Sequence, residues 1–214
     1  MAKTSHKPGP IPTGLDRLVF FSDAVIAIAI TLLVLDIKLP DAAGGSVLDL
    51  ARPLLNLWPK FLGYFVSFWV IALYWVAHHR CFRHIHSYDR RLIYLNFLFL
   101  MFIAFMPFPT GLLFSNPTQA ASVMLYAGTA AGMGFSLAGV WIYADRHNFI
   151  PAGLMRAAVR DIRLNLLLPP VVFLVSMCAA PLNATLAMYL WFLLIPVYIF
   201  RRHSETALML DESI

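Results

Sequence analysis

The sequence predicts an all-α integral membrane protein with six transmembrane helices per subunit, and three observations predict it. Hydrophobic residues make up 60% of the 214 residues and charged residues only 13%, about half the charged share of a soluble domain. The hydrophobic residues form six long runs, each near the ~20 residues that a spanning helix requires. The basic residues lie mostly in alternate loops, as they do in proteins that cross a membrane several times.

The six predicted spans cover residues 17–39, 57–81, 91–115, 119–143, 164–180 and 184–200. The fifth is the weakest, because it is short and contains Pro169 and Pro170, which would kink a helix or mark its start. In the fourth, Gly128 and Gly132 have the spacing that lets helix backbones approach closely in lipid. Residues 1–16 contain three prolines, two glycines and two lysines and predict a flexible cytoplasmic tail before a six-helix domain over 17–203. Residues 204–214 are expected to form a cytoplasmic C-terminal tail.

The loop charges predict that both termini lie in the cytoplasm. Thirteen of the 16 Lys and Arg residues lie at the N-terminus, between spans two and three, between spans four and five, or after span six. Only Lys38, Arg52 and Lys60 fall on the other side. The positive-inside rule places the basic side in the cytoplasm, which agrees with an even number of spans. The net charge of +5 therefore reports topology, and no nucleic-acid partner is expected.

The first span has a stripe of residues at alternating spacings of four and three, which share one face of a helix. The stripe consists of Arg17, Phe21, Ala24, Ile28, Thr31, Leu35 and Lys38. It is mostly apolar, with one hydroxyl near the middle and a cation at each end. Ordinary packing between helices would explain such a stripe, and the alternative is the lining of a symmetric contact or a pore.

Asp23 lies inside the first span, about 140° around the helix from Ile28. A charge at the membrane centre costs about 2.5–3.5 kcal/mol on insertion scales, so an intramembrane acid usually has a partner. Candidate partners at a similar depth are His78, His79, Arg17, Arg80 and Asn96. We expect Asp23 to bond one of the two histidines, with one arginine and the asparagine completing a network.

Three strings resemble the first three helices of the bacterial branch of the transmembrane protein 175 family, whose animal member is the lysosomal and endosomal potassium channel. They are Arg17-x-x-x-Phe21-Ser22-Asp23 with the apolar run 24–35, Trp75-x-x-His78-His79, and Tyr94-Leu95-Asn96 with Pro107-Phe108. The resemblance covers the first half of the chain well, whereas the second half matches mainly in hydropathy and helix count.

The resemblance implies a homotetramer in the bacterial inner membrane, with a central pore lined by the first helix. It implies that Ile28 lies at an apolar constriction, Thr31 at a hydroxyl ring that potassium contacts transiently, and Leu35 at a second apolar layer. Residues implied to hold the pore helix are Arg17, Phe21, Ser22, Asp23, His78, His79 and Asn96. The implied function is a potassium-permeable cation channel of weak to moderate selectivity over sodium, without a cofactor beyond the permeant potassium ions.

Two other function classes stay open. A secondary transporter with an Asp/His proton relay is the stronger rival, because such relays occur in transporters and prolines can interrupt their helices. An enzyme or haem protein would rest on the cluster His78, His79, His84 and His86, which lacks a zinc-protease motif. That cluster lies among arginines, so a basic loop that meets anionic lipid is the better interpretation, and no enzyme is expected.

Overall fold

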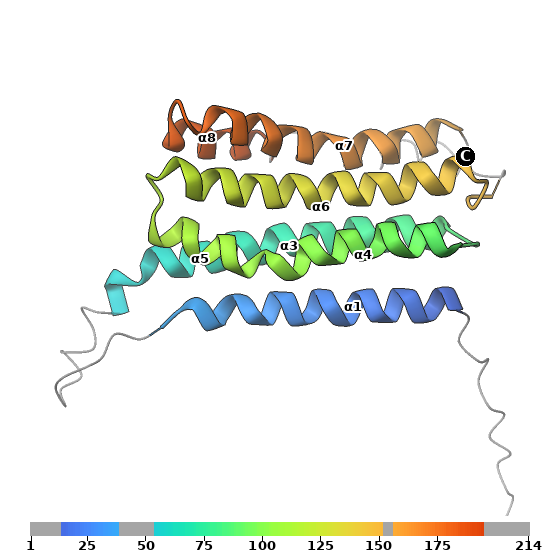
Figure 1. Ribbon diagram of the computed structural model, residues 1–214, viewed down its shortest axis with the longest axis horizontal. Helices are drawn as coiled ribbons and strands as arrows, with labels where there is room; N and C mark the ends of the chain where they lie inside the picture. Colours follow the sequence, from blue (N-terminus) through green and yellow to red (C-terminus); the bar gives the residue numbers. More distant parts are fainter. Residues whose placement is uncertain (1–13, 39–53, 152–155, 195–214) are drawn as a thin grey trace, which may run out of the picture.

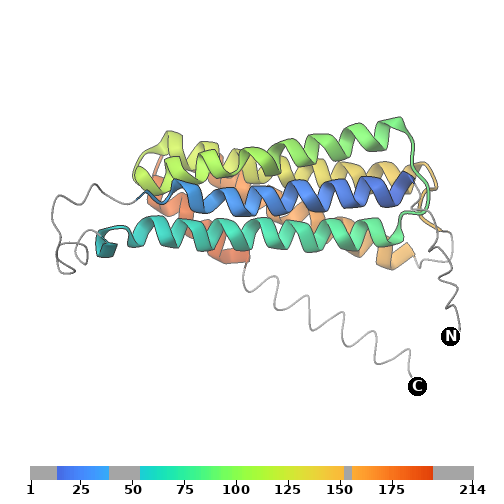
Figure 2. The same cartoon turned by 90° about the horizontal axis from the view of Figure 1, so that it is seen from below.

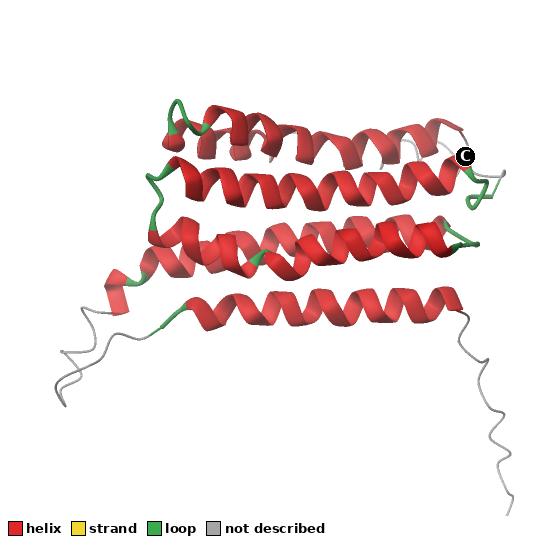
Figure 3. Ribbon diagram, in the orientation of Figure 1, coloured by secondary structure: helices red, strands yellow, loops and turns green. Residues whose placement is uncertain are grey.

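The computed structural model describes residues 14–38, 54–151 and 156–194, and these form helices joined by short loops (Figures 1 and 3). The helices, in chain order, are α1 (Gly14–Leu32), continued by the 3₁₀ turn η1 (Leu33–Asp36), α3 (Trp58–His84), α4 (Arg90–Phe105), α5 (Pro107–Ser115), α6 (Ala120–Arg146), α7 (Arg156–Ala179), α8 (Ala184–Tyr189) and the 3₁₀ turn η2 (Leu190–Leu193). The predicted all-α membrane fold is confirmed at this level.

Five helical segments among the described residues are long and apolar enough to cross a membrane. They are Gly14–Leu35, Trp58–His84, Arg90–Ser115, Ala120–Arg146 and Arg156–Ala179. The sixth predicted span is represented by the shorter apolar segment Ala184–Leu193, and its remaining residues from 195 lie outside the described part. The predicted tails also fall outside it, except for residues 14–16, which belong to α1.

Prolines lie at two of the places where the structure differs from the predicted spans. The fifth helix begins at Arg156, well before residue 164, so Pro169 and Pro170 lie inside α7 and do not mark its start. The third predicted span is divided into α4 and α5 at Met106. Pro107 is the first residue of α5, where its missing N–H costs least.

The helices stack in layers (Figure 1). α1 forms one outer layer, α3 lies beside α4 and α5 in the next, α6 follows, and α7 and α8 form the opposite outer layer. Seen from below, α1 lies between α3 and α4 (Figure 2), and it contacts α3, α4 and α5. One long face of α1 therefore has no helix of this chain packed against it among the described residues.

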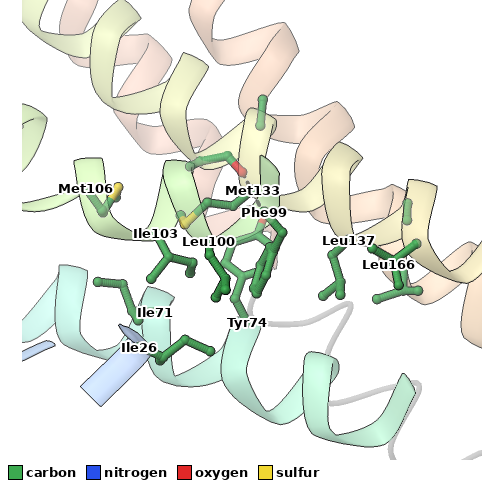
Figure 4. Close-up of a cluster of buried hydrophobic side chains, with 14 of the residues drawn as sticks. Ile26, Ile71, Tyr74, Phe99, Leu100, Ile103, Met106, Met133, Leu137 and Leu166 are labelled. Carbon is green, nitrogen blue, oxygen red and sulfur yellow. Dashed lines mark hydrogen bonds between the residues drawn. The ribbon is translucent and has the colours of Figure 1, made fainter. Parts of the chain in front are cut away.

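The core lies where α3, α4 and α6 meet (Figure 4). Its labelled side chains are Ile26, Ile71, Tyr74, Phe99, Leu100, Ile103, Met106, Met133, Leu137 and Leu166. α6 can approach its neighbours closely because it has glycines at the contacts. A Cβ atom at Gly132 would lie 2.6 Å from the Phe102 ring of α4, and one at Gly134 would lie 2.6 Å from Pro170 of α7. Gly128 instead faces Met177 of α7, so Gly128 and Gly132 contact different helices.

Candidate functional site

The stripe of the first helix lies on the face of α1 that is turned away from the rest of the chain, with Phe21 at its edge in contact with α4. Its seven residues, Arg17, Phe21, Ala24, Ile28, Thr31, Leu35 and Lys38, are all exposed. Ile28 is 58% and Leu35 is 67% exposed, large values for aliphatic side chains. The opposite face of α1 is buried against the chain through Leu18, Ser22, Ile26 and Ala29. This α1 stripe is therefore free to meet lipid, a pore or another copy of the chain.

Thr31 provides the polar group of the exposed face between Ile28 and Leu35. Its hydroxyl donates a hydrogen bond of 2.8 Å to the carbonyl oxygen of Ile28, one turn earlier. A hydroxyl has one proton and two lone pairs, so the oxygen keeps lone pairs after it donates. Thr31 can therefore offer an oxygen ligand to a cation, between apolar residues that offer none.

A buried polar network fixes the inner face of α1 to two other helices. The Asn96 side-chain amide of α4 donates to the Ser22 hydroxyl of α1 at 2.8 Å, and Ser22 donates to the Leu18 carbonyl at 2.8 Å. His78 Nε2 of α3 lies 2.9 Å from Asn96 Oδ1. All three side chains have no exposed surface. Because Asn96 Oδ1 can only accept, His78 Nε2 carries the proton in this bond.

The structure gives Asp23 a different hydrogen-bond partner from the predicted histidine. The Asp23 carboxylate accepts a hydrogen bond of 2.8 Å from the indole nitrogen of Trp75. His78 is not its partner, because Nε2 of His78 bonds Asn96 and Nδ1 has no hydrogen bond. Asp23 and Ser22 are adjacent on α1 and point in different directions, so Ser22 enters the network predicted for Asp23. His79 is exposed and stacks on Trp75 with ring centroids 5.7 Å apart.

Trp75 is the functional candidate that sequence reasoning missed. Its string with His78 and His79 supports the family resemblance but does not by itself indicate a hydrogen-bonding role. The sequence offers a partial signal, because an indole N–H donates a hydrogen bond wherever water is scarce, but it does not identify the acceptor. Phe21, also in the predicted set, contacts Phe97 of α4 edge to face at a centroid distance of 5.8 Å. Arg17 is exposed near the N-terminal end of α1.

Known proteins resemble this chain along most of its length. The family model described as the endosomal/lysosomal potassium channel TMEM175 matches residues 17–107. A potassium channel of Streptomyces collinus is 37% identical over 194 residues, which is 85% of this chain and 93% of that protein. A potassium channel of Chamaesiphon minutus is 40% identical over 131 residues, 60% of this chain and 64% of that relative, just under two thirds of its length.

The fold also matches a solved structure. The crystal structure of a lysosomal potassium-selective channel TMEM175 homolog from Chamaesiphon minutus superposes with a TM-score of 0.71 at 32% sequence identity. The match covers 87% of this chain and 97% of that one. The similarity therefore includes the second half of the chain, where the sequence alone offered only hydropathy and helix count.

Proposed function

This chain belongs to the TMEM175 family, and on that premise we propose that it is a potassium-permeable cation channel whose pore is lined by α1. The observation that carries the proposal is the exposure of the whole α1 stripe while the opposite face is fixed by Ser22, Asn96 and His78. A helix held so firmly on one side presents a reproducible surface on the other. The potassium-channel names of the relatives from Streptomyces collinus and Chamaesiphon minutus support the same function.

One helix cannot enclose a pore, so the channel requires several copies of the chain. We propose a homotetramer, in which four α1 stripes face a common axis and Ile28 and Leu35 form apolar rings. Narrow apolar rings can gate conduction by dewetting. The four Thr31 hydroxyls between them provide few and weak ligands, so potassium binds transiently and selectivity over sodium is weak to moderate. Potassium is the permeant ion, and conduction needs no bound cofactor.

In the proposed topology, α8 and η2 begin a sixth span, and both termini lie in the cytoplasm of a bacterium whose inner membrane holds the channel. The exposed arginines at the end of the subunit where α1 begins support this orientation. Those at the ends of the spanning helices on this side are Arg83, Arg90, Arg91, Arg146, Arg156 and Arg160. Such a basic rim would attract anionic lipid headgroups, which are the proposed lipid partners.

A carrier or an enzyme is less well supported. The carrier hypothesis depended on an Asp/His relay, but Asp23 accepts from Trp75 and His78 bonds Asn96. The described residues contain no group of three or more His, Cys, Asp or Glu side chains placed to hold a metal ion. The relatives named above are called channels, and we propose that this chain likewise has no catalytic function.

The deciding experiment is a planar-bilayer recording with purified protein under opposed potassium and sodium gradients. Discrete currents that reverse between zero and the potassium equilibrium potential support the channel and give its permeability ratio. Bilayers prepared with the same detergent but without protein provide the control. A silent bilayer, together with solute-coupled flux into liposomes, would contradict a channel and would make the α1 stripe a packing surface of a carrier.

A further inference from the structure

The first turn of α1 rests on the loop between α3 and α4, which consists of residues 85–89. Gly14 begins α1, and a Cβ atom at this position would overlap the hydroxyl group of Tyr88. The missing side chain therefore lets Tyr88 lie directly on the α1 backbone. Ile85, at the start of the loop, is buried, which anchors that part of the loop in the subunit. Loop 85–89 thus forms a seat for the beginning of α1.

The same loop is fixed from its other side by the end of α6. The Tyr143 hydroxyl donates a hydrogen bond of 2.6 Å to Asp89 Oδ2. Oδ1 of Asp89 accepts from the backbone N–H of Leu92 at 2.8 Å and so caps α4. The backbone N–H of His86 donates to the carbonyl oxygen of Phe149 at 3.0 Å. Loop 85–89 is therefore held between α1 and the segment that follows α6.

Tyr143 is itself held by the residues that follow α6. The His147 ring stacks on the Tyr143 ring at a centroid distance of 3.9 Å, and its Nδ1 lies 3.0 Å from the Tyr143 carbonyl oxygen. Asn148 has φ 58°, in the left-handed region, which reverses the chain so that Phe149 can meet His86. The direction of the Tyr143 hydroxyl is thus set by residues 147–149, directly after α6.

We propose that Asp89 and Tyr143 are positioning residues for α1. Whether their hydrogen bond is formed or broken affects the first turn of α1 through Tyr88. The inference rests on the proposed function in one respect: if α1 lines the pore, its first turn forms the inner mouth. When the Asp89–Tyr143 bond is intact, loop 85–89 is fixed and Tyr88 supports Gly14. When it is broken, loop 85–89 loosens, and residues 147–149 thereby control the inner mouth without touching the α1 stripe.

Hydrogen exchange of the full-length protein in lipid nanodiscs tests the coupling. Tyr143→Phe removes only the hydroxyl, and we expect amide exchange in the first two turns of α1, residues 15–20, to rise about fivefold or more. Asp89→Asn keeps a residue able to cap α4 and should change the same amides in the same direction, to a smaller extent. Tyr189→Phe on the distant α8 is the matched control and should leave residues 15–20 unchanged.

Single-channel recording provides the readout that a merely structural role would not change. Tyr143→Phe should alter the open probability about threefold or more, while the unitary conductance and reversal potential stay constant because the α1 stripe is intact. Increased exchange confined to loop 85–89 and the end of α6, with residues 15–20 unchanged, would overturn the coupling. Absence of wild-type current would instead refute the channel, and the exchange data would still decide whether the seat is coupled to α1.

Discussion

Asp23 of α1 and Trp75 of α3 form a hydrogen bond of 2.8 Å from the indole nitrogen to carboxylate Oδ1. Asp23 is half-buried, and a charged acceptor makes such a bond about twice as strong as a neutral one. The bond lies outside the buried network of Ser22, Asn96 and His78, so α1 is attached to α3 through Trp75 and to α4 through Asn96. The bond to Trp75 gives this acid a hydrogen-bond partner inside a membrane-spanning helix.

Replacing Trp75 by Phe should weaken the attachment of α1 while keeping the aromatic ring. Loss of a hydrogen bond to a charged group costs about 1.5–3 kcal/mol, and in this variant the Asp23 carboxylate loses the indole N–H as a donor. We expect a lower melting temperature in detergent and a smaller assembled fraction in size-exclusion chromatography. Trp69→Phe is the control, because Trp69 is 63% exposed on the same helix. Equal stability of the two variants would contradict the role of the indole N–H.

Gly134 should tolerate no side chain, whereas Gly139 on the same helix should. A Cβ atom at Gly134 would lie 2.6 Å from the Pro170 ring, but at Gly139 it would meet no atom within 4 Å. Gly134→Ala is expected to destabilise the protein by about 1–3 kcal/mol, as overpacking does. Gly139→Ala should be neutral or stabilise it by up to about 1 kcal/mol through helix propensity. Thermal unfolding in one detergent compares the two, and a similar loss in both would exclude the contact with Pro170 as the cause.

Acid should release loop 85–89 only well below neutral pH. The hydrogen bond from Tyr143, followed by that from the Leu92 backbone, lowers the pKa of Asp89 below its ordinary value. Because the pKa of Asp89 is lower in the folded protein, its ionised carboxylate stabilises the folded form at pH values above the ordinary Asp pKa of about 4. This stabilisation is lost as the pH falls through the lower pKa of the folded form. Tyr143→Phe should therefore shift acid-induced exchange of residues 85–92 to higher pH. An unchanged midpoint would show that Tyr143 does not set this pKa.

The sequence could predict the α1 stripe because a helical period alone decides which residues share a face. It could not predict the partner of Asp23, because the choice between Trp75 and His78 depends on the rotation of α3 against α1 and on side-chain reach. The start of α7 was missed for another reason. The first turns of α7 contain the charged residues Arg156, Arg160 and Asp161. Because hydropathy detects only the apolar part of a helix, it does not show that the helix begins at these charged residues.

The position of Ile28 on the α1 stripe predicts its effect on conduction. Ile28→Ala should widen an apolar ring and raise the unitary conductance about twofold or more, since a narrow dewetted segment limits ion flow. Ile30→Ala changes a half-buried residue off the stripe and should leave the conductance of assembled channels unchanged. Single-channel amplitudes in symmetrical potassium measure both. Equal conductance in wild type and Ile28→Ala would remove Ile28 from the constriction.

Thr31 should determine ion preference more than ion flow. Its oxygen retains lone pairs while its proton bonds the Ile28 carbonyl, so removal of the hydroxyl takes away a cation ligand and leaves the helix intact. Thr31→Ala should lower the potassium-to-sodium permeability ratio about twofold or more while currents persist. Thr31→Ser keeps the hydroxyl and should retain the wild-type reversal potential. If both variants reverse at the wild-type potential, the Thr31 hydroxyl is not the ligand that sets ion preference.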